Sequence, residues 1–159
     1  MMWFVFLAVA LAGMAMHLSR DKSPRTAARV VDVALLYLLV IFAGGGGLMG
    51  ALGHTFRARE IALGIGWPPG SPFQFEVAMA NLAFGVLGVL CIWQRGGFWT
   101  ATGVGWAVFL LGCAYGHVRE VLAGNFAPMN AGLMIWQADV LMPLAILFLL
   151  FMRRRLAKD

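Results

Sequence analysis

Five long apolar runs, separated by short polar segments, dominate the pattern of hydrophobic and polar positions along the chain. Each run approaches or exceeds the roughly 20 residues that a helix needs to cross the hydrocarbon core of a bilayer. The pattern therefore predicts an all-α fold, in which residues 1–159 form one domain built as an integral membrane bundle of five transmembrane helices. The predicted spans cover residues 3–18, 30–53, 75–93, 98–122 and 131–152.

The composition supports a membrane bundle. Of the 159 residues, 62% are hydrophobic and 12% are charged, whereas a soluble domain is about half apolar and about a quarter charged. So much apolar surface can coat several helices on all sides, which only a lipid environment tolerates. The net charge of +5 comes from basic residues at the ends of the apolar runs. This charge therefore reports topology, and nucleic acid is not an expected partner.

The distribution of Lys and Arg predicts the orientation of the bundle. Of the 12 basic residues, nine lie in the first and third connections and the C-terminal tail, and three lie in the second and fourth connections. The positive-inside rule assigns the more basic side to the cytoplasm. The N-terminus is therefore expected outside and the C-terminus in the cytoplasm. Because basic residues follow the first run and do not precede it, this run is expected to be an uncleaved span and not a signal peptide.

Glycines mark faces on which helices can pack closely. Gly46 and Gly50 stand four residues apart in the second run, as do Gly112 and Gly116 in the fourth. Such small-xxx-small pairs let two backbones approach each other. Packing within one bundle is the favoured interpretation, and a homo-oligomer or a membrane-protein partner is the alternative. The four consecutive glycines at positions 44–47 also leave room for a kink or a ligand.

Polar side chains enter the apolar runs mainly at their predicted outer ends. These residues are His54, Arg57, Glu60, Glu76, Asn81, His117, Arg119, Glu120, Asn125, Asn130, Gln137 and Asp139. Polar groups inside a span are costly and usually face protein or water. At about 1.5 Å of rise per residue, Asn81 and Asp139 both lie roughly 14 Å inside their spans. His117 and Glu120 share one face of the fourth span, so an outward-facing polar cluster is expected.

This cluster has a functional and a structural interpretation. The ligand-binding candidates are Glu76, Asn81, His117, Glu120, Asn130 and Asp139. The alternative is a structural network, in which charges near helix ends reach the headgroups or form ion pairs, as Asp32 is expected to do with Arg29 at the inner end. The sequence leaves both interpretations open.

Two chemistries are favoured for the cluster over a proton or ion path across the whole membrane, because the inner half of the bundle has few polar residues. A divalent metal could be held by His117 and Glu120, with His54, Glu76 or Asp139 completing the set. The His-x-x-Glu order, however, reverses the Glu-x-x-His pair of di-iron bundles and occurs in one copy. A His and a carboxylate could also move a proton on a lipid-soluble substrate. Whether the protein is an enzyme therefore stays open, and no cofactor is implied.

The residues before the third span include recognised signals for the start of a helix. Ser71 is expected as the N-cap, Pro72 as the first helical residue and Gln74 as the third, which together form a capping box. Glycines and prolines at positions 66–70 predict the preceding turn.

The tryptophans predict the membrane interfaces. Trp67 and Trp136 are expected near the outer interface, and Trp93 and Trp99 near the inner one, as in an aromatic belt. Trp106 falls in mid-span and is expected to pack inside the bundle.

Three stretches carry a resemblance to a known family. They read "GWPPGSPFQFEVAMANLAFGVLG", "YGHVREVLAGNFAPMNAG" and "WQADVLMPL", and cover residues 66–88, 115–132 and 136–144. They resemble an uncharacterised family of small prokaryotic multi-spanning membrane proteins, a domain of unknown function. The resemblance implies a multi-pass protein of the prokaryotic cytoplasmic (inner) membrane and implies no activity.

Three functions fit these observations. The first is a small integral membrane protein whose outward-facing polar pocket binds a small molecule or a lipid. The second is an accessory or interaction subunit of a larger membrane complex, suggested by the glycine faces and the lack of soluble mass. The third is a metal-dependent membrane enzyme. The lipid bilayer is the expected partner in all three.

Overall fold

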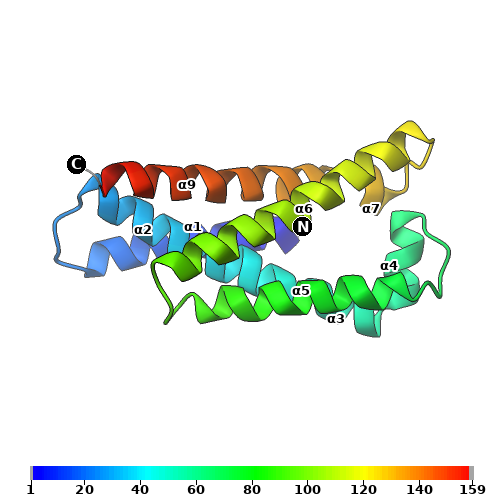
Figure 1. The fold of residues 1–159 in the computed structure, drawn as a ribbon, viewed down its shortest axis with the longest axis horizontal. Helices are drawn as coiled ribbons and strands as arrows, with labels where there is room; N and C mark the ends of the chain where they lie inside the picture. Colours follow the sequence, from blue (N-terminus) through cyan, green and yellow to red (C-terminus); the bar gives the residue numbers. More distant parts are fainter. Residues whose placement is uncertain (1, 158–159) are drawn as a thin grey trace.

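The computed structural model describes residues 2–157, which form helices joined by short loops with no strand in that range (Figure 1). Five helical stretches are long and apolar enough to cross a membrane: Trp3–Arg20, Ala27–Phe56, Phe73–Leu90, Gly97–Leu122 and Pro128–Leu156. The predicted all-α class and the number of spans are thus confirmed, and the chain has the architecture of a multi-pass membrane protein. Lys158, counted among the basic residues of the tail, lies outside the described residues.

Several of these stretches are divided into shorter elements. The first span is α1 (Met2–Arg20), and the second comprises α2 (Ala27–Leu38), η1 (Leu39–Gly46) and α3 (Gly47–Phe56). The short helix α4 (Ala58–Ile65) follows, and then α5 (Phe73–Leu90) and α6 (Gly97–Leu122) form the third and fourth spans. The fifth comprises α7 (Pro128–Ala131), α8 (Leu133–Ile135), η2 (Trp136–Leu141) and α9 (Met142–Leu156).

The connections alternate between two ends of the bundle (Figure 1). The loops at residues 21–26 and 91–96 lie at the same end as the C-terminal end of α9, on the left of the view. Helix α4 and the loop at residues 123–127 lie at the other end. The connections that carry most of the basic loop residues therefore share one end of the bundle.

The second and third spans pack with their backbones in close approach. A Cβ atom on Gly47 would lie 2.6 Å from the backbone nitrogen of Gly85, and one on Gly85 would lie 2.8 Å from the backbone nitrogen of Leu48. A side chain at either position would displace backbone, so glycine is required there. This contact fixes α3 against α5.

The four glycines singled out as packing faces divide into two pairs. Gly46 faces the ring of Trp3, and a Cβ on Gly50 would lie 2.6 Å from the side-chain oxygen of Asn81. A Cβ on Gly112 or Gly116 would meet nothing within 4 Å. The first pair therefore packs within its own chain, whereas the second pair leaves space beside the backbone.

Two of the spans contain π-helical segments. The segment η1 includes three of the four consecutive glycines, so the run that the sequence marks for a kink is wound as a π-helix. The segment η2 carries Asp139. π-helical turns are rare in proteins, but those that occur are often found at functional sites. Asp139 is therefore a candidate for a functional role.

The predicted capping box before α5 is wrong. The helix begins at Phe73, and no side chain caps its first turn. Gln74 is 4% exposed, and its side-chain amide donates a hydrogen bond of 2.6 Å to the carbonyl of Ala58. The amide therefore ties α4 to α5 instead of capping the helix.

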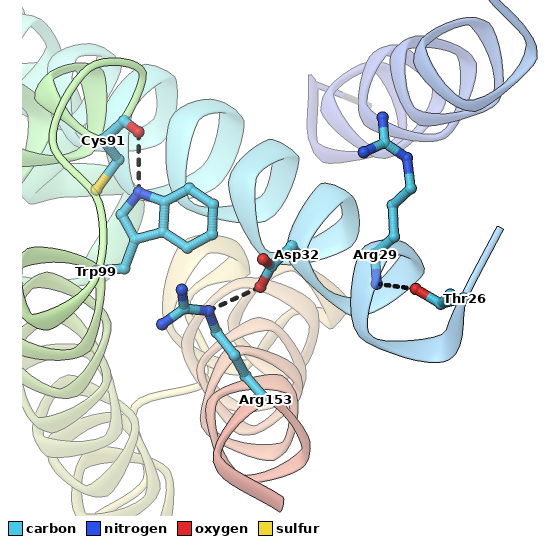
Figure 2. Close-up of polar contacts among 6 residues, drawn as sticks. All are labelled: Thr26, Arg29, Asp32, Cys91, Trp99 and Arg153. Carbon is cyan, nitrogen blue, oxygen red and sulfur yellow. Dashed lines mark hydrogen bonds and ion pairs between the residues drawn. The ribbon is translucent and has the colours of Figure 1, made fainter. Parts of the chain in front are cut away.

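The predicted pairing of Asp32 with Arg29 is also wrong. Arg153 of α9 donates a hydrogen bond of 2.7 Å to Asp32 of α2 (Figure 2). Arg29 instead pairs with Asp21, and its backbone N–H donates to the N-cap side chain of Thr26 (Figure 2). The packing of α2 beside α9 brings Arg153 to Asp32, which spacing within one helix cannot reveal.

The tryptophans differ in burial. Trp93 and Trp136 are exposed, whereas Trp106 is 2% exposed and packs in the core, as expected. Trp99, predicted near the inner interface with Trp93, is only 1% exposed. Its indole N–H donates a 2.9 Å hydrogen bond to the carbonyl of Cys91, which draws the ring inward (Figure 2).

Candidate functional site

A cavity of about 540 Å³ lies in the half of the bundle that contains α4 and α7. Its size falls within the range of about 300–1,000 Å³ that is usual for small-molecule sites. Its aromatic lining includes Trp3, Phe6, Phe42, Trp106 and Phe109. Its polar lining includes His54, Asn81, His117, Arg119, Glu120 and Asp139. A largely apolar space with a few polar groups on its wall suits an amphipathic molecule.

Helices α4 and α7 contribute to the lining of one end of this cavity. Ile61, Ile65 and Met129 line the cavity at this end. The side-chain amide of Asn125 donates a 2.9 Å hydrogen bond to the carbonyl of Ile65, which joins the loop to α4. The side-chain oxygen of Asn125 accepts from the backbone N–H of Ala127 at 3.1 Å, which holds the loop in its turn.

A chain of hydrogen bonds orients His117 at the cavity wall. The side-chain amide of Asn130 donates to the carbonyl of Asn125 at 2.7 Å. This bond turns the side-chain oxygen of Asn130 toward the ring of His117, where the distance to Nδ1 is 2.7 Å. Because that oxygen can only accept, the hydrogen-bond network assigns the ring hydrogen to Nδ1. In the neutral ring, Nε2 is therefore an acceptor.

Asp139 faces the other side of the His117 ring. The distance from Nε2 to the carboxylate Oδ2 is 3.7 Å, and each side chain is 14% exposed. This separation is too long for a direct hydrogen bond. Asp139 comes from η2 and His117 from α6, so the two acceptors meet through the packing of the fourth and fifth spans. Such a pair can bind a hydrogen-bond donor, or the ring can accept a proton and form an ion pair with the carboxylate.

The other ligand-binding candidates lie around this pair or away from it. Asn81 lines the cavity from α5, but its amide donates to the carbonyl of Val77 in its own helix at 2.9 Å. Glu120 also lines the cavity, and one of its carboxylate oxygens accepts from Asn125 at 3.2 Å. Glu76 is exposed and lies outside the cavity lining. The structure thus bonds His117 to Asn130, places Asp139 beside the same ring, and leaves Glu76 apart.

The structure does not assemble the predicted metal ligands. Over residues 2–157, no three His, Cys, Asp or Glu side chains come close enough together to hold a metal ion. His54, His117 and Glu120 all line the cavity, but His117 is oriented by Asn130, and Glu120 bonds to Asn125. His54 stands alone, with a buried Nδ1 that has no hydrogen-bond partner in the described part of the chain.

The family comparison agrees with the resemblance seen in the sequence. Residues 1–159 match a protein family described as a family of unknown function (DUF6790). The chain belongs to DUF6790. No curated protein and no solved structure matches it. The site in this DUF6790 protein is therefore interpreted from its own geometry.

Parts of the DUF6790 site were absent from the sequence-based candidates. Trp3 and Phe6 of α1 line the cavity, but nothing in an apolar run distinguishes a cavity-lining ring from a lipid-facing one. Asn125 orients Asn130 through its backbone carbonyl, a role that side-chain chemistry does not signal. Asn125 and Asn130, which stand on either side of Pro128, could have indicated this loop structure, because Asn side chains often bond to nearby backbone in turns.

Proposed function

We propose that this DUF6790 protein is a small integral membrane protein that binds a small amphipathic molecule or lipid in the cavity between its helices. The observation that supports this proposal is the pair of acceptors, Nε2 of His117 and Oδ2 of Asp139, 3.7 Å apart on the wall of a largely apolar cavity. The apolar body of a ligand would fill the apolar part of the cavity, and its polar head would donate a hydrogen bond to one of the two acceptors.

A purely structural network accounts for only part of this arrangement. Hydrogen bonds to Asn130 and Asn125 explain the orientation of the His117 ring. They do not supply a hydrogen between Nε2 and Asp139, or a partner for the buried Nδ1 of His54. Buried polar atoms such as Nδ1 of His54 are rarely left without a partner. A ligand with a polar head would supply a hydrogen to the pair formed by Nε2 of His117 and Oδ2 of Asp139.

The alternative, an accessory subunit of a larger complex, is supported by fewer glycines than the sequence suggests. Gly46 and Gly50 contact Trp3 and Asn81 of the same chain, so these glycines are not free for a partner. A homo-oligomer or a membrane-protein partner would therefore use Gly112 or Gly116, beside which there is open space. Blue-native electrophoresis tests this prediction: a monodisperse monomer in mild detergent would contradict it.

The proposal includes a location and an orientation. We expect the protein in the cytoplasmic membrane of a prokaryote, with the cavity near the outer side and the C-terminus in the cytoplasm, because the basic residues favour that side. A green fluorescent protein fused after residue 159 should fluoresce in intact cells. An active alkaline phosphatase at the same position would contradict the orientation.

A pair of glycine variants tests the binding function. Gly116 lines the cavity, whereas Gly112, one turn earlier in α6, does not. A Cβ meets nothing within 4 Å at either position, so α6 should accept a larger residue at both. We expect Gly116→Phe to fill part of the cavity and Gly112→Phe to add a ring outside it.

The measurement is binding of para-octylphenol, a small amphipathic probe, to the full chain in lipid nanodiscs. Native mass spectrometry counts the probe molecules on each protein and separates them from probe dissolved in lipid. Wild type and Gly112→Phe should bind one molecule, and Gly116→Phe should bind at least tenfold more weakly. Equal binding by all three proteins, or none by wild type, would overturn the proposed function.

A further inference from the structure

Two hydrogen-bond acceptors, on His117 and Asp139, lie side by side on the polar wall of the cavity. Asn130 holds the ring hydrogen of His117 on Nδ1 at 2.7 Å, so neutral His117 presents a lone pair on Nε2. The carboxylate oxygen Oδ2 of Asp139 lies 3.7 Å from Nε2, and it also accepts. Two acceptors side by side with no hydrogen between them are complementary to a donor.

The remaining polar groups limit the charge of that donor. The cavity is also lined by His54, Cys113, Arg119 and Glu120. An anionic head beside Asp139 would meet a like charge, which is costly where water is excluded. A cationic head would lose its hydration in an apolar space, and Arg119 lines the same cavity. A neutral hydroxyl avoids both costs and still supplies a hydrogen.

The ligand body must match an aromatic lining. The rings of Trp3 and Phe42 are stacked with centroids 5.5 Å apart and an interplanar angle of 10°, and both line the cavity with Trp106 and Phe109. Flat rings of this kind offer a large apolar surface and favour offset or edge contacts with another ring. The lining therefore suits an alkyl or aromatic body.

The geometry points to a neutral alcohol or phenol on an apolar body as the ligand class, with its hydroxyl donating to Nε2 of His117 or Oδ2 of Asp139. This inference rests on the proposed function, because it names the chemistry of the molecule that the cavity takes. The same hydroxyl oxygen can accept a second hydrogen bond, as required if another group on the cavity wall donates.

The experiment compares two probes, in the second of which a methyl group replaces the hydroxyl hydrogen. Para-octylphenol can donate, whereas para-octylanisole carries a methoxy group in place of the hydroxyl and cannot. Both are titrated into the full chain in nanodiscs and counted by native mass spectrometry. A hydrogen bond to a charged or buried acceptor corresponds to roughly tenfold in affinity or more. Wild type should therefore bind the phenol at least tenfold more tightly than the anisole.

Variants assign this preference to the two acceptors. His117→Leu removes the acceptor Nε2, and Asp139→Asn replaces a carboxylate oxygen with an amide group that can itself donate to Nε2. At least one of these variants should reduce the phenol preference to about twofold or less, according to which acceptor the hydroxyl uses. Glu76→Gln makes the same carboxylate-to-amide change on a side chain outside the cavity lining and should keep the full preference. The wild-type comparison does not depend on whether the variants fold.

Each outcome bears on one of the two proposals. Equal binding of phenol and anisole by wild type would overturn the hydroxyl assignment and leave the binding function intact. Failure of both probes to bind would overturn both proposals. Tighter binding of para-octylbenzylamine than of the phenol would show that the head is cationic, and would also overturn the assignment. A phenol preference that survives in Asp139→Asn and in His117→Leu would overturn the role of this pair.

Discussion

Replacing Asn130 with alanine should destabilise the protein, because this one side chain holds three parts of the bundle together. Asn130 is 1% exposed. Its amide donates to the carbonyl of Asn125 at 2.7 Å, and its oxygen lies 2.7 Å from Nδ1 of His117. It thereby links the loop at residues 123–127, α7 and α6. Truncation at Cβ removes both bonds and leaves both partners inside the protein.

The magnitude follows from the two bonds and their burial. Each hydrogen bond contributes about 0.5–1.5 kcal/mol net, and each partner left without a bond costs about 1–3 kcal/mol when it is fully buried. The side chain of His117 is 14% exposed, and Asn125 is half-buried, so water can reach both in part. We therefore expect Asn130→Ala to lower the free energy of unfolding by about 2–4 kcal/mol.

Asn81→Ala provides the matched control, because it removes the same atoms. The Asn81 amide donates only to the carbonyl of Val77, one turn earlier in α5, and that carbonyl lies within a helix whose backbone bonds remain. The expected cost is below about 1 kcal/mol. Unfolding of both variants is measured by titration with sodium dodecyl sulfate in mixed micelles, monitored by circular dichroism. Equal destabilisation by the two substitutions would refute the role given to Asn130.

Three further substitutions test the packing of the spans in the same unfolding assay. Gly47→Ala should cost about 1–3 kcal/mol by overpacking, because its Cβ would lie 2.6 Å from a backbone nitrogen, whereas Gly112→Ala should leave stability unchanged. Asp32→Asn should cost no more than about 1 kcal/mol, since the side chains of Asp32 and Arg153 are 47% and 32% exposed; a larger loss that persists in high salt would contradict this. Trp99→Phe should cost about 1–3 kcal/mol by leaving a buried carbonyl without its donor, and an unchanged midpoint would argue against that bond.

The spans could be predicted from the sequence because each follows from local composition. A run of apolar residues must form a helix in lipid, since the bilayer offers no other partner for its backbone. The same reasoning located Trp106 in the core, because the residue falls in mid-span. The ends of the helices were predicted less accurately. The third span ends at Leu90 and not at residue 93. The chain turns after Leu90, and the carbonyl of Cys91 accepts a hydrogen bond from Trp99.

The pairings could not be predicted in the same way. Asp32 and Arg153 are separated by 121 positions, and Gln74 bonds to a backbone carbonyl of α4. Both contacts depend on which helices lie side by side. Short-range rules instead suggested Arg29 for Asp32 and Ser71 for Gln74, and both suggestions were wrong. The sequence marked polar residues at similar depths, but only the packing of α6 against η2 brings His117 to Asp139.

The central claim is that the cavity beside His117 and Asp139 holds a small amphipathic molecule. A high-resolution density map of the wild-type protein in lipid nanodiscs with para-octylphenol tests it most directly. The account predicts non-protein density inside the cavity, with its polar end within hydrogen-bond distance, about 2.7–3.2 Å, of Nε2 of His117 or Oδ2 of Asp139. A cavity closed by its own side chains, with His117 bonded directly to Asp139 and the probe only in the surrounding lipid, would contradict it.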